Sequence, residues 1–147
     1  MDKGGKQLIV AVSLFLFFIY SGYGQCKNFI KKQCLPNLAP YTSDGQLNNA
    51  QLAAGETAEL EFTFYSGQEY RIYVCAQEVL GVIHFKLMDS NRKELFNSAN
   101  GKDSYWDFHI ETTQQLILDV STPATKDPIV ASGCVGVLVG FKDSKKQ

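Results

Sequence analysis

The sequence predicts an all-β protein whose main domain is an antiparallel β-sandwich, jelly-roll-like, with seven or eight strands and a short N-terminal helical turn. Two observations predict the fold: apolar and polar residues alternate in several segments, and turn-forming residues separate these segments every ten residues or so. A third observation, an apolar N-terminal run followed by four cysteines, predicts secretion and disulfide bonds.

Residues 1–24 have the features of a secretory signal. Two lysines precede an apolar run at 8–20, and small residues follow it up to Gly24. The run is shorter than the roughly 20 apolar residues of a membrane-spanning helix. We expect cleavage before Gln25 and release into the periplasm or the medium, without stable membrane insertion. Lipidation of Cys26 is disfavoured, because Gln25 stands where a lipoprotein signal has a small residue.

The remaining chain, about 123 residues, suits a single domain. We expect a helical turn and connector at 25–44, the sandwich at 45–142 and a disordered tail at 143–147. Without the signal the chain carries 12 basic and 14 acidic residues, a net charge of −2. This charge argues against a nucleic-acid partner, which needs a basic surface.

The clearest strand signals lie between Glu56 and Cys75. Alternation over 57–65 and again after Gln68 predicts two strands, and Gly67 can take a positive φ in the turn between them. We therefore expect a β-hairpin. The residues expected to face the core are Ala58, Leu60, Phe62, Phe64, Tyr70, Ile72 and Val74.

Five further strands are expected downstream, each with an apolar face. Their ranges are 82–89, 94–97, 105–111, 115–120 and 133–141. The expected core residues are Ile83, Phe85, Leu87, Trp106, Phe108, Ile110, Leu116, Leu118, Val120, Val135, Val137 and Val139, whereas His84, Lys86 and Met88 are expected to point outward.

The four cysteines, Cys26, Cys34, Cys75 and Cys134, all follow the signal and predict two disulfides. Cys75 and Cys134 lie opposite the core residues of their strands, which favours pairing Cys75 with Cys134 and Cys26 with Cys34. If 26–34 were helical throughout, however, its ends would be roughly 12 Å apart, beyond the usual limit of about 7 Å. Cys26 must then fold back, or these two cysteines pair elsewhere. A zinc site is disfavoured, since no Cys-x-x-Cys is present.

The segments FYSGQEYRIYVC, YWDF, TQQLILDV and SGCVGVLVGF resemble an uncharacterised family of short, secreted proteins of Gram-negative bacteria. The resemblance covers nearly all of the chain after the signal. That family has no established activity, so the resemblance implies no catalytic or binding residues. The hairpin pattern is also similar to the β-sandwich modules of the bacterial pre-peptidase C-terminal type.

Catalytic chemistry finds little support. Asp107, His109 and Glu111 alternate along one strand, and His84 would join them if its strand were adjacent, which makes these four the candidates for a metal site. The favoured interpretation is a solvated strand face. No Gly-x-Ser-x-Gly turn or phosphate-binding loop occurs. We therefore expect neither enzymatic activity nor a cofactor.

Binding has more support. Tyr65, Tyr73 and Tyr105 fall on faces opposite the core and are the candidate ligand-binding residues, although the favoured interpretation is that they cover the second face of the sheet or support strand pairing. The loops 97–104 and 121–129 are long enough to carry recognition. The expected function is a non-catalytic envelope or extracellular binding module with a protein or glycan partner. The alternatives are a structural envelope protein without a soluble ligand and a metal-binding, hydrolase-associated domain.

Overall fold

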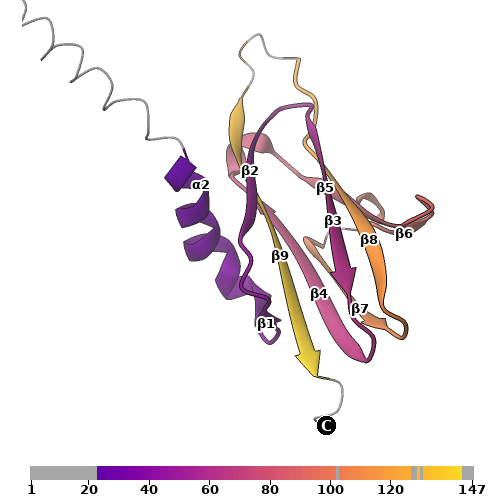
Figure 1. Cartoon of the computed structure of the whole chain (residues 1–147). Coiled ribbons are helices and arrows are strands. Elements are labelled where there is room, and N and C mark those ends of the chain that lie inside the picture. The colour runs from indigo at the N-terminus through magenta and orange to yellow at the C-terminus, as the bar shows by residue number, and fades with distance from the viewer. Residues whose placement is uncertain (1–22, 102, 127–128, 130, 144–147) are drawn as a thin grey trace, which may run out of the picture.

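The chain forms two antiparallel β-sheets packed face to face, with a helical segment on the outer side of one of them (Figure 1). This computed structural model describes residues 23–101, 103–126, 129 and 131–143, without the side chains of Tyr23 and Asp143. The expected antiparallel β-sandwich with a short N-terminal helix is confirmed.

The described residues contain nine strands rather than seven or eight. The N-terminal helical segment consists of the α-helix α2 (Tyr23–Phe29), the π-helical turn η1 (Ile30–Cys34) and the 3-10 turn η2 (Leu35–Leu38). The strands are β1 (Thr42–Ser43), β2 (Asn48–Ala53), β3 (Thr57–Phe64), β4 (Gln68–Ala76), β5 (His84–Asp89), β6 (Glu94–Asn97), β7 (Tyr105–Ile110), β8 (Gln114–Ser121) and β9 (Ser132–Asp143). Two more 3-10 turns are η3 (Glu78–Leu80) and η4 (Ser98–Asn100).

One sheet has the order β1-β9-β4-β7, and β2 also pairs with β9; the other has the order β3-β8-β5-β6. The two strands that the sequence had not indicated, β1 and β2, both pair with the long strand β9, one after the other. Because β9 is the longest strand, it can pair with both of them on one side and with β4 on the other.

The expected core faces are correct. Inward residues of both sheets form one cluster, in which Phe64, Tyr70 and Phe108 make edge-to-face and stacked ring contacts with centroids 4.8–5.9 Å apart. Trp106 stacks between Phe96 and Phe108 and joins β7 to β6 across the edge of the sandwich. Met88, expected to face outward into water, is only 8% exposed, because it lies opposite the buried Ile117 on the outer face of its sheet.

The expected hairpin is wrong, although its two strands and their inward residues are right. β3 pairs with β8, whereas β4 pairs with β7 and β9 in the opposite sheet. The turn at Gly67, with φ of 78°, therefore connects the two sheets instead of two neighbours in one sheet. Alternation shows only which side of a strand faces a core. Because both sheets face the same core, a hairpin within one sheet and a turn between the two sheets give the same pattern.

The N-terminal segment docks on the outer face of β9. Buried residues recur every fourth position in the helical segment, and alternate positions of β9 lie beneath them. Ile30 lies over Gly136, and Leu38 lies over Gly140. Twelve residues of helix, from Cys26 to Leu38, span about 18 Å. Six residues of strand, from 134 to 140, span about 20 Å, so the spacings of the two contacting rows match. A second cluster of buried residues results: Ile30, Cys34, Leu38 and Leu138.

Both disulfides hold this segment to the sheet. Cys26 bonds to Cys134, and Cys34 bonds to Cys75, so all four cysteines are bonded as expected but in another pairing. Residue 75 lies opposite Gly136, so Cys134 is its diagonal neighbour, at a typical Cα separation of 7–8 Å, too far for a disulfide. Because α2 continues directly into η1, Cys26 and Cys34 stay apart and each bonds to a strand.

The structure covers neither end of the chain completely. Residues 1–22 of the expected signal are not among the described residues, and residues 23–24 begin α2. β9 extends to Asp143, one residue into the expected tail, and 144–147 are outside the described residues. Among the helices that the structure describes, none has the length and apolar character needed to cross a bilayer.

Candidate binding surface

A hollow of about 380 Å³ opens where the end of β4 separates from the loop that leads into β5. β7 begins opposite Tyr73, so residues 74–76 extend beyond its pairing. We call this site the β4–β5 hollow. It is lined by Tyr73, Val74, Cys75, Ala76, Gly81, Val82, Ile83, His84, Phe85, Ser98, Gly101, Asp103 and Ser104.

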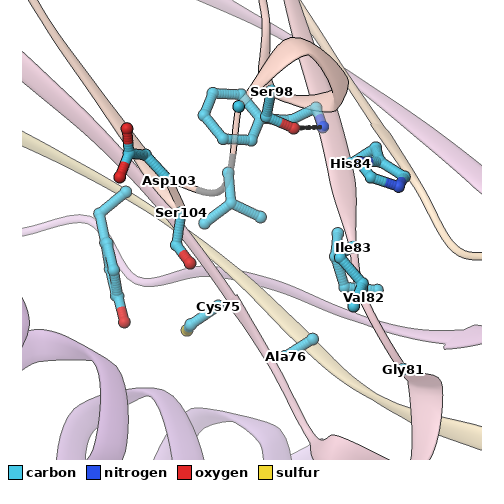
Figure 2. A pocket seen from close by; sticks show the side chains of 13 residues that line it. Cys75, Ala76, Gly81, Val82, Ile83, His84, Ser98, Asp103 and Ser104 are labelled. Atoms are coloured by element: carbon cyan, nitrogen blue, oxygen red, sulfur yellow. Dashed lines mark hydrogen bonds between the residues drawn. The ribbon is translucent and has the colours of Figure 1, made fainter.

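Opposite walls of the β4–β5 hollow have different chemical character. Figure 2 shows Asp103 and Ser104 on one side, with Val82 and Ile83 across from them on the β5 side. Val82 is 72% exposed, and Val79 on the adjoining turn is 58% exposed. The hollow therefore combines a carboxylate and a hydroxyl with an unusually exposed apolar rim.

The loop 98–104 is held to the sandwich by a buried serine. Ser98 is 5% exposed, and its hydroxyl oxygen accepts a hydrogen bond of 2.9 Å from the backbone N–H of Phe85 (Figure 2). The side chain of Asn97 caps the following turn by accepting from the N–H of Ala99. The same loop also borders a second hollow of about 320 Å³ beside β6. Part of the expected recognition loop thus lies between two concave surfaces.

The three candidate tyrosines do not form one patch. Tyr73 and Tyr105 are register partners on β4 and β7, but Tyr73 is partly buried against the N-terminal segment. Tyr65 is 62% exposed and lies next to the turn at the other end of β4, about 17 Å away at 3.4 Å per residue. Tyr73 therefore covers part of the second face of the sheet and also lines the β4–β5 hollow, whereas Tyr65 and Tyr105 are more exposed.

The candidate metal ligands are not brought together. His84 is in the four-stranded sheet, whereas Asp107 and His109 are in the other. Asp107 is engaged by Arg71 at 2.7 Å, and His109 contacts Glu69 at 3.0 Å. Within the described part of the chain, no group of three or more His, Cys, Asp or Glu side chains is arranged to hold a metal ion.

The remaining member of that candidate set, Glu111, follows the end of β7 and is exposed. It belongs to no group of three or more potential metal ligands among the described residues.

Arg71 is the centre of a polar cluster that the sequence did not reveal. Its guanidinium donates two hydrogen bonds of 2.7 Å to Asp107, and its Cζ lies 4.6 Å from the ring centre of Tyr41 and 4.2 Å from that of Tyr105. The hydrogen bond to Asp107 is the main cause of a raised Arg71 pKa. Burial, followed by the nearby Asp107 carboxylate, raises the pKa of Tyr41.

The signal that could have revealed this cluster is the pairing of charges across two antiparallel strands. Glu69 and Arg71 face His109 and Asp107 in register. The Arg71–Asp107 pair is complementary in charge, and the Glu69–His109 pair is complementary in hydrogen bonding, once β4 and β7 are known to be neighbours. Alternation alone could not identify β7 as the partner of β4.

Known proteins share the fold of this chain. No family model matches it, and no curated protein matches it. Its structure is similar to that of Aeromonas hydrophila PliG, a periplasmic lysozyme inhibitor of g-type lysozyme, with a TM-score of 0.51. The match covers 70% of this chain and 89% of PliG at 9% sequence identity, so it shows a common fold. The resemblance to short secreted proteins of Gram-negative bacteria stays a prediction.

Proposed function

We propose that this chain is a secreted, non-catalytic binding module that holds a protein partner at the β4–β5 hollow. The observation that carries the proposal is the strongly exposed Val82 in the wall of this hollow, with Val79 also exposed on the turn η3 before it. Exposed apolar residues grouped around a hollow are typical of interaction surfaces. The two disulfides support secretion, since such bonds persist in oxidising compartments.

The fold likeness supports the same class of function. PliG is described as an inhibitor of g-type lysozyme, hence as a protein that acts on another protein in the periplasm. A lysozyme of this type is therefore the first partner to try for the present chain. The periplasm is the first compartment in which to look for it.

Site-specific photo-crosslinking tests the proposal. A crosslinking amino acid is placed at Val82 in one variant and at Tyr65 in a matched control, because both positions are strongly exposed but lie at different ends of the sandwich. We expect a defined protein adduct from residue 82 and none from residue 65, first with purified g-type lysozyme and then in the native envelope. Equal adducts at both positions, or no protein adduct at residue 82, would contradict the proposal.

A glycan partner is the second candidate, and the exposure of Tyr65 favours it. Exposed aromatic rings can stack on sugars. Glycan-array binding that is lost in Tyr65→Ala but kept in Val82→Glu would favour this candidate over a protein partner. The opposite result would assign binding to the hollow.

A further inference from the structure

We propose that a cleft between β2 and β3 binds a neutral small molecule that has a short alkyl chain and a carbonyl group. The cleft measures about 190 Å³ and lies where the two sheets meet along one side of the sandwich, away from the residues of the β4–β5 hollow. We call it the β2–β3 cleft. It is lined by Asn48, Asn49, Ala50, Leu52, Ala58, Glu59, Leu60, Val120, Val135 and Val137.

The walls of the cleft are apolar because inward residues of four strands supply them. Ala50 pairs with Val135 on one sheet, and Ala58 pairs with Val120 on the other. Small alanines at facing positions leave space that larger side chains would fill. The ligand must therefore present mostly hydrocarbon to these walls.

Asn48 supplies the polar contact. It pairs with Val137 and has the same phase as Ala50 and Leu52, so its amide points inward among apolar neighbours. Its Nδ2 atom is buried and has no hydrogen-bond partner. Buried donors without an acceptor are rare and destabilising, and each needs an explanation. A ligand carbonyl in the cleft would accept this hydrogen bond once the Asn48 amide turns toward it.

The size and charge of the cleft restrict the ligand further. An apolar cavity of about 150 Å³ is large enough for benzene, so 190 Å³ suits a chain of about six carbons. Glu59 borders the cleft, and Arg92 binds its carboxylate with two contacts of 3.0 Å. The residues that line the cleft include no lysine, arginine or histidine to bind an anion, which points to an amide or ester rather than a fatty acid.

The proposal is tested by NMR titration of the oxidised protein with three probes: N-methylhexanamide, hexanoate and benzene. We expect N-methylhexanamide to shift the methyl resonances of Leu60, Val120 and Val137 saturably, and hexanoate to bind at least tenfold more weakly. Absence of a saturable shift at these methyl groups with the amide would overturn the proposal, as would equal affinity for the amide and the anion.

Two variants separate the polar contact from the cavity. Asn48→Leu should weaken binding of the amide by about tenfold, the usual effect of one lost hydrogen bond, while binding of benzene persists. Gln51→Leu, on the opposite face of the same strand, is the matched control and should change neither. Ala58→Leu should block both probes by filling the cleft. Unchanged amide affinity in Asn48→Leu would exclude the assigned hydrogen bond.

Discussion

Ile30 lies against Gly136 so closely that a Cβ atom on residue 136 would overlap its side chain. Ile30 is fully buried, although it belongs to a helical segment outside the sandwich core. The contact exists because residue 136 has no side chain on the outer face of β9. The glycine thus allows the helical segment to approach the strand, and both disulfides form on either side of this approach.

Gly136→Ala should destabilise the protein by about 1–3 kcal/mol, because the added methyl group must displace Ile30 or the strand. Chemical denaturation with the disulfides intact measures the change. Gly101→Ala is the matched control, since a Cβ atom there has nothing within 4 Å, and it should change stability by less than about 0.5 kcal/mol. Equal effects of the two substitutions would show that the helical segment does not constrain residue 136.

Non-reducing peptide mapping should recover Cys26 linked to Cys134 and Cys34 linked to Cys75. Intact mass on the same sample should place the first residue at Gln25. In the loop-entropy account, loss of the Cys34–Cys75 bond by a double substitution to serine should cost about 4 kcal/mol. Peptides joining Cys75 to Cys134 would instead support the pairing that the strand pattern favoured and would contradict the docked position of the helical segment.

Arg71→Lys should destabilise the protein by about 1–2 kcal/mol. The lysine keeps the charge but loses the two-pronged contact with Asp107 and the flat contact with the rings of Tyr41 and Tyr105. Its site is well shielded, with the Arg71 side chain 13% exposed.

Arg92→Lys is the control for Arg71→Lys, because Arg92 also makes two contacts with one carboxylate, that of Glu59, but its side chain is 59% exposed. Exposed ion pairs contribute little, so thermal unfolding of this variant should resemble that of the unmodified protein. A larger loss of stability from Arg92→Lys than from Arg71→Lys would contradict the conclusion that the shielded Arg71 contacts contribute more to stability.

Asp119→Asn should stabilise the protein at neutral pH, and the gain should disappear in acid. Burial, followed by repulsion from Glu59, raises the pKa of Asp119 above its ordinary value of 3.8. Asp119 therefore contributes favourably to the free energy of unfolding below its pKa in the unfolded chain. This contribution is lost as the pH rises through its pKa in the folded protein.

Denaturation of the Asp119→Asn variant and the unmodified protein at several pH values between 3 and 7 measures this difference. The stability gain should increase with pH and approach zero below about pH 4. Glu61→Gln, an exposed position two residues after Glu59 on the same strand, is the control for a change of surface charge. A gain that does not depend on pH would assign the effect to packing instead of ionisation.

The candidate site could be predicted only in part. The loop 97–104 was identified from its length and polarity, and it borders the β4–β5 hollow. The exposed Val82 was not identified, because a valine that opens an alternating segment cannot be told from a strand residue. The sequence also does not identify Asn48 as a site residue, because an asparagine in a polar connector gives no sign that its amide will lie between two sheets.

The sequence by itself determined which side of each main strand faces a core, and that the cysteines are bonded. Alternation is a local property of the chain, so Phe64, Ile72 and Leu118 could be assigned to the core without knowing their partners. Only the tertiary structure decided that β3 and β4 belong to different sheets and that Cys34 bonds to Cys75. These choices depend on contacts between distant segments, above all the docking of the helical segment on β9, and the pattern within one strand carries no information about them.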